Sequence, residues 1–115
     1  MRTFTLIDGG LGINVDEFGT LVPFSYGLSI PLPNPSVNHI KIAFALPHPK
    51  KVKLNVYNSV GQLVKTLIDE HREPGVYYVV WDGTDDNGRS AAAGIYFYQY
   101  STDEFKDTKK AVLIR

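Results

Sequence analysis

The chain lacks cysteine, and its charges balance: its 115 residues include 12 basic and 12 acidic side chains. The absence of cysteine excludes disulfide frameworks, thiolate metal sites and cysteine nucleophiles, but it leaves the cellular compartment open. The formal net charge of zero provides no electrostatic attraction to DNA or RNA, whose binding proteins usually present a basic face. We therefore expect no nucleic-acid partner.

Long hydrophobic runs are also missing. No apolar stretch approaches the roughly 18 residues that a membrane-spanning helix needs. Residues 1–8 do not show the basic head and apolar stretch of a secretory signal peptide. If the protein is exported, we expect this chain to be part of a longer one or to use another route.

The composition favours β-structure. The chain contains 7 Tyr, 6 Phe, 10 Gly and 7 Pro, so residues suited to pleated strands are punctuated by turn formers. Apolar and polar residues alternate with period two, and no long helical pattern interrupts them. The chain is long enough to bury one core without staples. The pattern predicts one all-β domain, an antiparallel β-sandwich of about seven strands. The best-defined strands are expected at residues 40–46, 51–57, 62–68, 76–81, 94–100 and 105–115.

The strand at residues 94–100 is expected at the centre of a sheet, because both of its faces carry bulky side chains. Trp81, Tyr96 and Tyr98 are then core or core-edge residues. Residues 28–35 contain three prolines, which remove backbone donors, so we expect an extended corner and not a paired strand.

Residues 1–25 are interpreted as a linker or a lead-in edge strand. Leu11, Ile13 and Val15 alternate with polar or small residues and predict a short strand there. Two interpretations remain open. The segment either joins the sandwich as an edge strand, or it mediates self-association by adding a strand to the open sheet edge of a neighbouring molecule.

Short motifs recur in a fixed order from residue 26 to the end of the chain, and each is weak alone. In this order and at this spacing they closely resemble the type A C-terminal sorting domain of the type IX secretion system and the related immunoglobulin-like domain of the flagellar hook-capping protein. The residues that carry the resemblance are Pro33, Asn34, Pro35, Gly75, Tyr77, Trp81, Asp82, Gly83, Gly88, Gly94 and Tyr96, followed by the terminal run Lys109, Lys110, Ala111, Val112, Leu113, Ile114 and Arg115.

The resemblance implies an immunoglobulin-like fold for residues 26–115 and a role as the sorting domain of an exported protein. It implies an outer-membrane translocon and a cell-surface sortase as partners. It implies a location outside the cell or on the surface of a Gram-negative bacterium, with the terminal run as the sorting signal. From residue physics alone, Lys109 and Lys110 are equally a solvated entry to an edge strand, where lysines discourage aggregation.

One cluster of oxygen ligands deserves a metal hypothesis. Asp82, Asp85, Asp86 and Asn87 lie in a glycine-containing loop and are a weak candidate for Ca²⁺. No bidentate glutamate ends the loop, and Asn87 and Gly88 are favoured at the two central positions of a hairpin turn. We favour the turn and expect no cofactor.

No catalytic motif is found. His39, His48 and His71 are far apart in sequence and are interpreted as exposed loop residues, not as a zinc site. Neither a nucleophile elbow nor a phosphate-binding loop is present, so we expect a protein that is not an enzyme.

Two alternatives to the sorting domain remain. The first is a structural subunit or adaptor of an extracellular or flagellar-type filament, assembled by strand addition. The second, a carbohydrate-binding module, depends only on the aromatic residues at 77, 78, 81, 96, 98 and 100. Such aromatics are usually core residues in a sandwich, which disfavours it.

Overall fold

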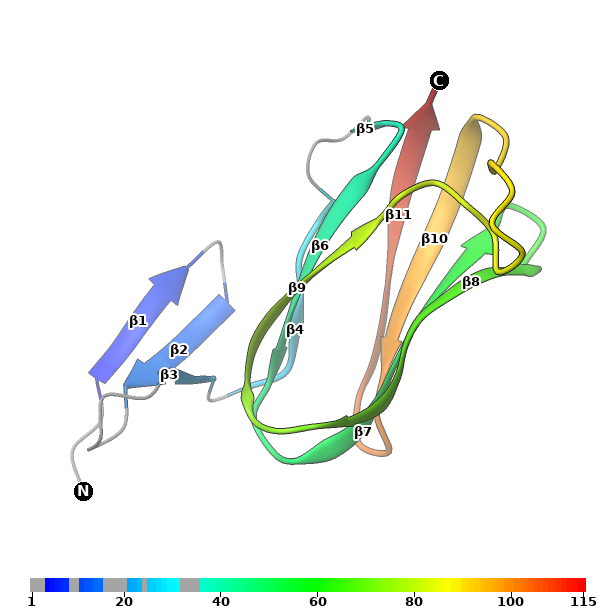
Figure 1. Ribbon diagram of the computed structural model, residues 1–115. Coiled ribbons are helices and arrows are strands. Elements are labelled where there is room, and N and C mark those ends of the chain that lie inside the picture. Colours follow the sequence, from blue (N-terminus) through cyan, green and yellow to red (C-terminus); the bar gives the residue numbers. More distant parts are fainter. Residues whose placement is uncertain (1–3, 9–10, 16–20, 24, 32–35) are drawn as a thin grey trace.

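The computed structural model describes residues 4–8, 11–15, 21–23, 25–31 and 36–115, and every regular element in these ranges is a strand. Figure 1 shows two packed sheets and a smaller sheet to one side. The described part of the chain contains no helix that is long and apolar enough to cross a membrane. The strands are β1 (Phe4–Asp8), β2 (Leu11–Val15), β3 (Leu21–Pro23), β4 (Gly27–Leu28), β5 (Ser36–Val37), β6 (Ile40–Leu46), β7 (Lys50–Asn58), β8 (Leu63–Arg72), β9 (Gly75–Trp81), β10 (Gly94–Ser101) and β11 (Lys106–Ile114).

The sandwich consists of a five-stranded sheet, in the order β5-β11-β10-β7-β8, and a three-stranded sheet, in the order β4-β6-β9. All neighbours are antiparallel except β5 and β11, which are parallel. The prediction of an all-β, immunoglobulin-like sandwich is confirmed, and so are its six long strands. The central position expected for residues 94–100 is also confirmed, because β10 pairs with both β7 and β11.

The core is built from the inward-facing residue of each alternating pair. Val52, Leu54 and Val56 of β7 face inward and are at most 1% exposed. Trp81 packs edge-on against Tyr96, with ring centroids 5.0 Å apart, as expected for core residues. The two sheets are also joined by buried hydroxyl groups. Tyr98 donates to the carbonyl of Ser29 at 2.6 Å, and Tyr100 donates to that of Ala45 at 2.9 Å.

The segment before the prolines differs from the prediction. Leu28 lies in β4 and pairs with Phe44 of β6, and the Ser29 amide donates to the carbonyl of Ala43 at 2.9 Å. Residues 28 and 29 precede the first proline of the segment, Pro31, and therefore keep the backbone donors that a ladder requires. The expectation of an unpaired corner was wrong for these two residues.

Strands β1, β2 and β3 form a separate three-stranded antiparallel sheet in this order. The strand predicted at Leu11–Val15 is present as β2, but it is not an edge strand. It pairs with β1 along one side and with β3 along the other, so both of its edges are occupied. Within the described residues, the two edge strands of this small sheet are β1 (Phe4–Asp8) and β3 (Leu21–Pro23).

Candidate recognition strand

The terminal run (residues 109–115) occupies the end of β11 and divides between its two faces. Ala111 and Leu113 point into the core and are each 1% exposed. Lys110, Val112 and Ile114 alternate with them and face outward. Because side chains alternate along a strand, only the second set is available to a partner without unfolding the domain.

One edge of β11 is largely unpaired by the part of the chain that the structure describes. Along its other edge, β11 pairs with β10 from Lys106 to Leu113. On the open side, β5 pairs only with Leu113 and Ile114, and the amide of Asn38 donates to the Ile114 carbonyl at 3.2 Å. The sequence interpretation of an edge strand therefore holds for residues 106–112 and is wrong for the last two paired residues.

Arg115 fixes the end of the terminal run by three side-chain hydrogen bonds. Its Nε donates to the carbonyl of Ala91 at 2.7 Å, and one terminal nitrogen donates to the carbonyl of Gly83. The other terminal nitrogen donates to Oδ1 of Asn38 at 3.4 Å. We call these four residues the Arg115 clasp. It ties β11 to the loop after β9 and to the turn before β6.

Gly83 is needed for the clasp on two counts. Its φ of +78° lies in the left-handed region, which residues with a Cβ rarely adopt. A Cβ at this position would also lie 2.6 Å from a terminal nitrogen of Arg115 and 3.0 Å from the carbonyl oxygen of Asn38. The sequence identified Gly83 only through a family resemblance, and the structure supplies its physical role.

The loop after Trp81 is stabilised by carboxylates that accept hydrogen bonds from the loop itself. Asp82 Oδ1 accepts from the Thr84 hydroxyl at 2.6 Å and from the Thr84 amide at 3.1 Å. The hydroxyl hydrogen bond holds the pKa of Asp82 below its usual value. Asp85 Oδ1 accepts from the amides of Asn87 and Arg89, at 2.9 and 3.0 Å.

Asp86 joins this loop to β8. Its Oδ1 accepts from the amide of Thr66 at 3.0 Å, and its own amide donates to the carbonyl of Val64 at 2.9 Å. In the calcium candidate formed by Asp82, Asp85, Asp86 and Asn87, each of the three carboxylates thus accepts a backbone amide. No group of three His, Cys, Asp or Glu side chains suited to a metal ion occurs among the residues that the structure describes.

The turn in this loop differs in detail from the predicted one. The amide of Gly88 donates to the Asp85 carbonyl at 3.0 Å, so Asp86 and Asn87 are the two central residues. Among residues 85–88 only Gly88 has positive φ, at +79°, and it is the fourth residue of the turn. Asn87 therefore does not need the left-handed conformation that we expected for an Asn-Gly hairpin.

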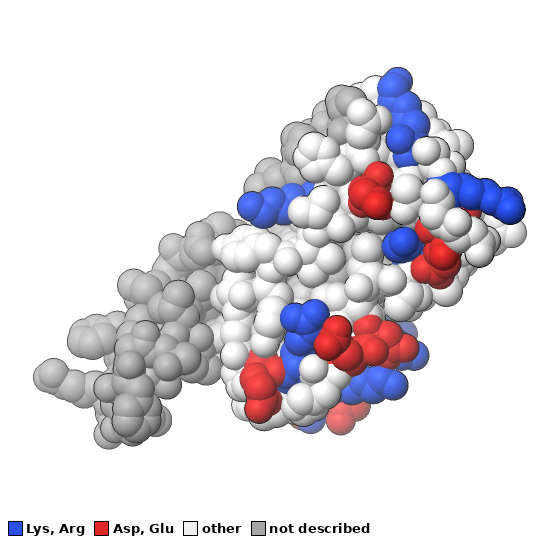
Figure 2. Space-filling model, in the orientation of Figure 1, with Lys and Arg blue, Asp and Glu red and all other residues white. Residues whose placement is uncertain are grey.

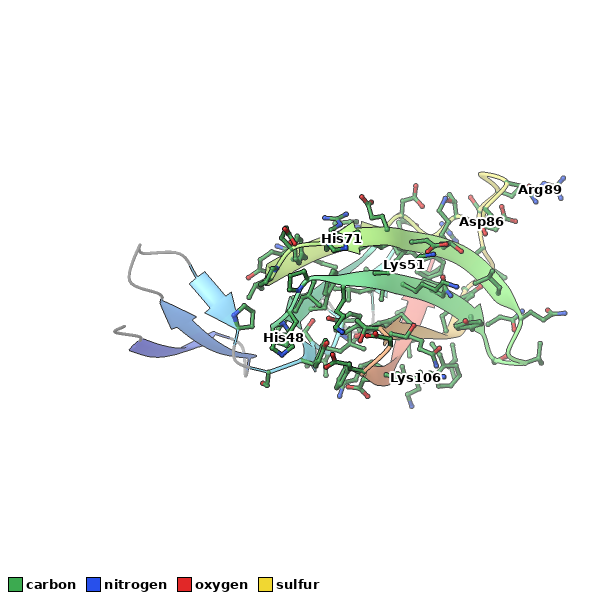
Figure 3. All side chains as sticks on the ribbon, turned by 90° about the horizontal axis from the view of Figure 1, so that it is seen from below. His48, Lys51, His71, Asp86, Arg89 and Lys106 are labelled. Carbon is green, nitrogen blue, oxygen red and sulfur yellow. The ribbon has the colours of Figure 1, made fainter. Side chains whose placement is uncertain are left out.

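The three histidines do not form a common site. His48 contacts the ring of Tyr26, and His71 Nε2 lies 3.3 Å from a carboxylate oxygen of Glu73. Figure 3 shows His48 and His71 on different parts of the sandwich. His39 directly precedes β6 and is exposed.

The remaining motif residues are structural in their contacts. The Tyr77 ring stacks on Phe44 with centroids 5.2 Å apart, and the Tyr96 hydroxyl donates to the carbonyl of Ala92. Gly75 begins β9, and Gly94 begins β10 with a φ of +153°. Pro33, Asn34 and Pro35 lie outside the described residues.

The aromatic residues considered for carbohydrate binding are mostly inside the molecule. Trp81, Tyr96, Tyr98 and Tyr100 are all buried. Burial raises the pKa of Tyr98 and Tyr100 above the usual range, so both keep their protons and act as internal donors. The outward-facing aromatics of the five-stranded sheet are instead Tyr57 and Phe97, which pair across β7 and β10. Sequence reasoning missed them, although their phase opposite to the buried residues was a usable signal.

Charges of both signs are interspersed. Figure 2 shows basic and acidic atoms side by side at two ends of the sandwich, with an uncharged band between them on that face. On β11, Lys109 Nζ lies 3.7 Å from a carboxylate oxygen of Asp107. Lys106 and Lys110 form no ion pair with another described residue.

Comparison with known proteins gives a family and a fold. The model of the FlgD Ig-like domain family matches residues 35–104. FlgD from P. aeruginosa has a TM-score of 0.52 at 26% identity, over 61% of this chain and 55% of FlgD. None of the curated proteins compared with the chain matches it.

Two further solved structures are similar in fold. Latent dimeric PorU of Porphyromonas gingivalis has a TM-score of 0.61 at 16% identity, over 90% of this chain and 12% of PorU. PorZ of the same species, described as an essential surface component of the type-IX secretion system, has a TM-score of 0.50 at 15% identity, over 99% of this chain and 16% of PorZ. The chain spans about half the length of FlgD and a small part of the other two.

Proposed function

Since the chain belongs to the FlgD Ig-like domain family, we propose that it is a non-catalytic sorting and attachment module. It directs an exported protein through the outer membrane to the surface of a Gram-negative bacterium. Its partners are the outer-membrane translocon and a surface sortase. The likeness in fold to PorU and PorZ, the second described as a type-IX secretion component, supports this direction.

The observation that carries the proposal is the construction of β11. In the terminal run, Lys110, Val112 and Ile114 face away from the core, and no other described strand pairs with the free edge of β11 from residue 106 to 112. A strand with an open edge can be read by backbone pairing, and its outward side chains add specificity. Arg115 and the core residues Ala111 and Leu113 hold this strand in place.

The test is an export assay. The 115-residue chain is fused behind a secreted reporter that has its own signal peptide, in a bacterium with a type IX system. Deleting residues 111–115 would also remove buried Ala111 and Leu113, so loss of export could reflect unfolding. The sharper variant is Val112→Ser with Ile114→Ser, which changes only outward side chains.

We expect the fused reporter to reach the cell surface and the double variant to remain in the periplasm with an unchanged melting temperature. Thr108→Ala, on the same face of β11, is the matched control and should be exported. A double variant exported as well as the control contradicts the proposal.

A structural subunit or adaptor of a filament is the second candidate. The observation that favours it is the small sheet, whose strand β1 has no partner on one side among the described residues. Such an edge can accept a strand of a neighbouring molecule. Size-exclusion chromatography of the chain with and without residues 1–25 tests it. Assembly through this sheet predicts that the full chain elutes as an oligomer and that the chain without residues 1–25 elutes as a monomer. A monomer in both cases contradicts it.

A further inference from the structure

The outer face of the five-stranded sheet carries an apolar band at one end. Strand pairing places Ile95 beside Val112, Phe97 beside Tyr57, and Tyr57 beside Leu63. Together with Ile114 these residues form a band from β11 to β8, which we call the outer stripe. Leu63 is 52% exposed, Ile95 45% and Ile114 42%, so the apolar surface is accessible.

The rest of this face is polar. Lys51 pairs with His71 and Lys53 pairs with Asp69 across β7 and β8. Across β10 and β11, Gln99 Nε2 donates to the Thr108 hydroxyl at 3.1 Å. Figure 3 shows Lys51 on this polar part and Lys106 on the β11 side of the sheet. Exposed apolar residues on the face therefore concentrate in the stripe, and such patches commonly mark interaction sites.

A shallow, open depression of about 380 Å³ adjoins the outer stripe at Tyr57 and Phe97. Tyr57 and Phe97 line it from neighbouring strands, and Gln99 and the turn residues Asn58, Ser59 and Gly61 complete it. Two rings bordered by amide and hydroxyl groups suit an apolar side chain of a partner that inserts from above, which is how interface anchors are usually seated.

We propose that the outer stripe is the surface on which a protein of the export machinery docks. This inference rests on the proposed function, because Val112 and Ile114 belong both to the stripe and to the terminal run. The partner is a folded protein that presents an apolar anchor with acidic groups beside it. Lys110 pairs with Phe97 of the stripe and forms no ion pair with another described residue, so it is placed to meet those acidic groups.

Charge decides against a second copy of the chain as the occupant. The stripe contains no acidic side chain, so a second copy packed face to face through it would give Lys110 no opposite charge, whereas an acidic partner would be attracted to it.

The experiment uses the reporter fusion with the whole chain. Ile95→Lys and Leu63→Lys change exposed positions outside β11 and keep a long aliphatic stem, so the melting temperature should change little. Each should lower surface display by about tenfold, the effect of losing an interface anchor. Lys53→Ser, on β7 outside the stripe, is the matched control and should display normally.

The two proposals fail separately. If Val112→Ser with Ile114→Ser blocks display but Ile95→Lys and Leu63→Lys do not, the outer stripe is not a docking surface and the proposed function stands. If the β11 variant displays normally, the proposed function fails.

Experiments with the chain free of its reporter, first in the periplasm and then purified, test the occupant directly. An excess of free chain in the periplasm should compete with the fusion for export, and the Leu63→Lys chain should not compete. A dimer that Leu63→Lys dissociates would assign the stripe to a second copy. Sedimentation with uncharged phosphatidylcholine vesicles that Leu63→Lys abolishes would assign it to lipid. Either result would overturn the proposal.

Discussion

The two faces of the five-stranded sheet come from the same strands but carry different tasks. On the inner face, Leu54, Tyr98 and Leu113 are at most 1% exposed and join the core. On the outer face, one residue away along each strand, Asn55, Phe97 and Val112 remain accessible. Because the side-chain period is two, a change on one face need not disturb the other. Stability and recognition are therefore separable by mutation in this domain.

The largest expected effect comes from emptying the inner face. Leu54→Ala removes a fully buried side chain and leaves a cavity, which should cost about 3 kcal/mol in the free energy of unfolding. Lys53→Ala, the outward neighbour, should stay within about 0.5 kcal/mol of the wild type. Urea denaturation measures both. Equal losses in the free energy of unfolding for the two variants would contradict the separate roles of the two faces.

The Arg115 clasp tests whether stability and recognition are also separable at the end of β11. Gly83→Ala should cost about 2 kcal/mol, because the added Cβ combines an unfavourable φ with a 3.0 Å approach to the Asn38 carbonyl and displaces the Arg115 guanidinium from the clasp. Gly61→Ala is the matched control. It has a similar φ of +85° but no atom within 4 Å of the added Cβ, so it should cost only about 1 kcal/mol.

An equal loss for the two glycine variants in thermal or urea unfolding would show that the clasp adds nothing to backbone strain. In an Arg115→Ala background the extra cost of Gly83→Ala should fall, since the clashing group is gone.

Removing one tyrosine hydroxyl from each face of the sheet should give a smaller difference in stability between the faces. Tyr100→Phe leaves the buried carbonyl of Ala45 without its donor and should cost about 1.5 kcal/mol. Tyr57→Phe on the outer face loses only a 3.2 Å hydrogen bond from Asn55 Nδ2 and should cost about 0.5 kcal/mol. Differential scanning calorimetry of both variants and the wild type measures the two losses of stability. A larger loss of stability for Tyr57→Phe than for Tyr100→Phe would contradict the assignment of the faces.

The smallest expected effect concerns Asp82 in the loop that holds the clasp. The Thr84 hydroxyl lowers its pKa, and a carboxyl with a lowered folded pKa stabilises the fold above its unfolded value of 3.8. That contribution is lost as the pH falls through the folded pKa. The melting temperature of Asp82→Asn should therefore lie slightly below the wild type near neutral pH and approach it in acid. A difference that does not change with pH would exclude this origin.

Much of the fold could be predicted from alternation alone. The strand Ile40–Leu46 and the centre of the sheet at Gly94–Ser101 follow from period two and from bulky residues. The small sheet was predicted only in part. Gly9 and Gly10, between β1 and β2, are a favoured two-residue hairpin loop and were a usable signal for that pairing, but β3 has only three residues and offers no pattern.

The candidate site was only partly predictable. The terminal run was identified by resemblance, but the division of Ala111 and Leu113 from Val112 and Ile114 required the register with β10. The clasp joins Arg115 to Gly83, residues that are distant in sequence, and no local pattern encodes such a contact. The outer stripe depends on pairing between four strands for the same reason.

The central claim is that the outward side chains near the end of β11 are read by an export partner. The most direct measurement is the ratio of surface-exposed to periplasmic reporter for Val112→Ser with Ile114→Ser, relative to Thr108→Ala, with both melting temperatures determined. We predict that the ratio falls by about tenfold while the two melting temperatures agree. Equal ratios in two folded proteins would contradict the account.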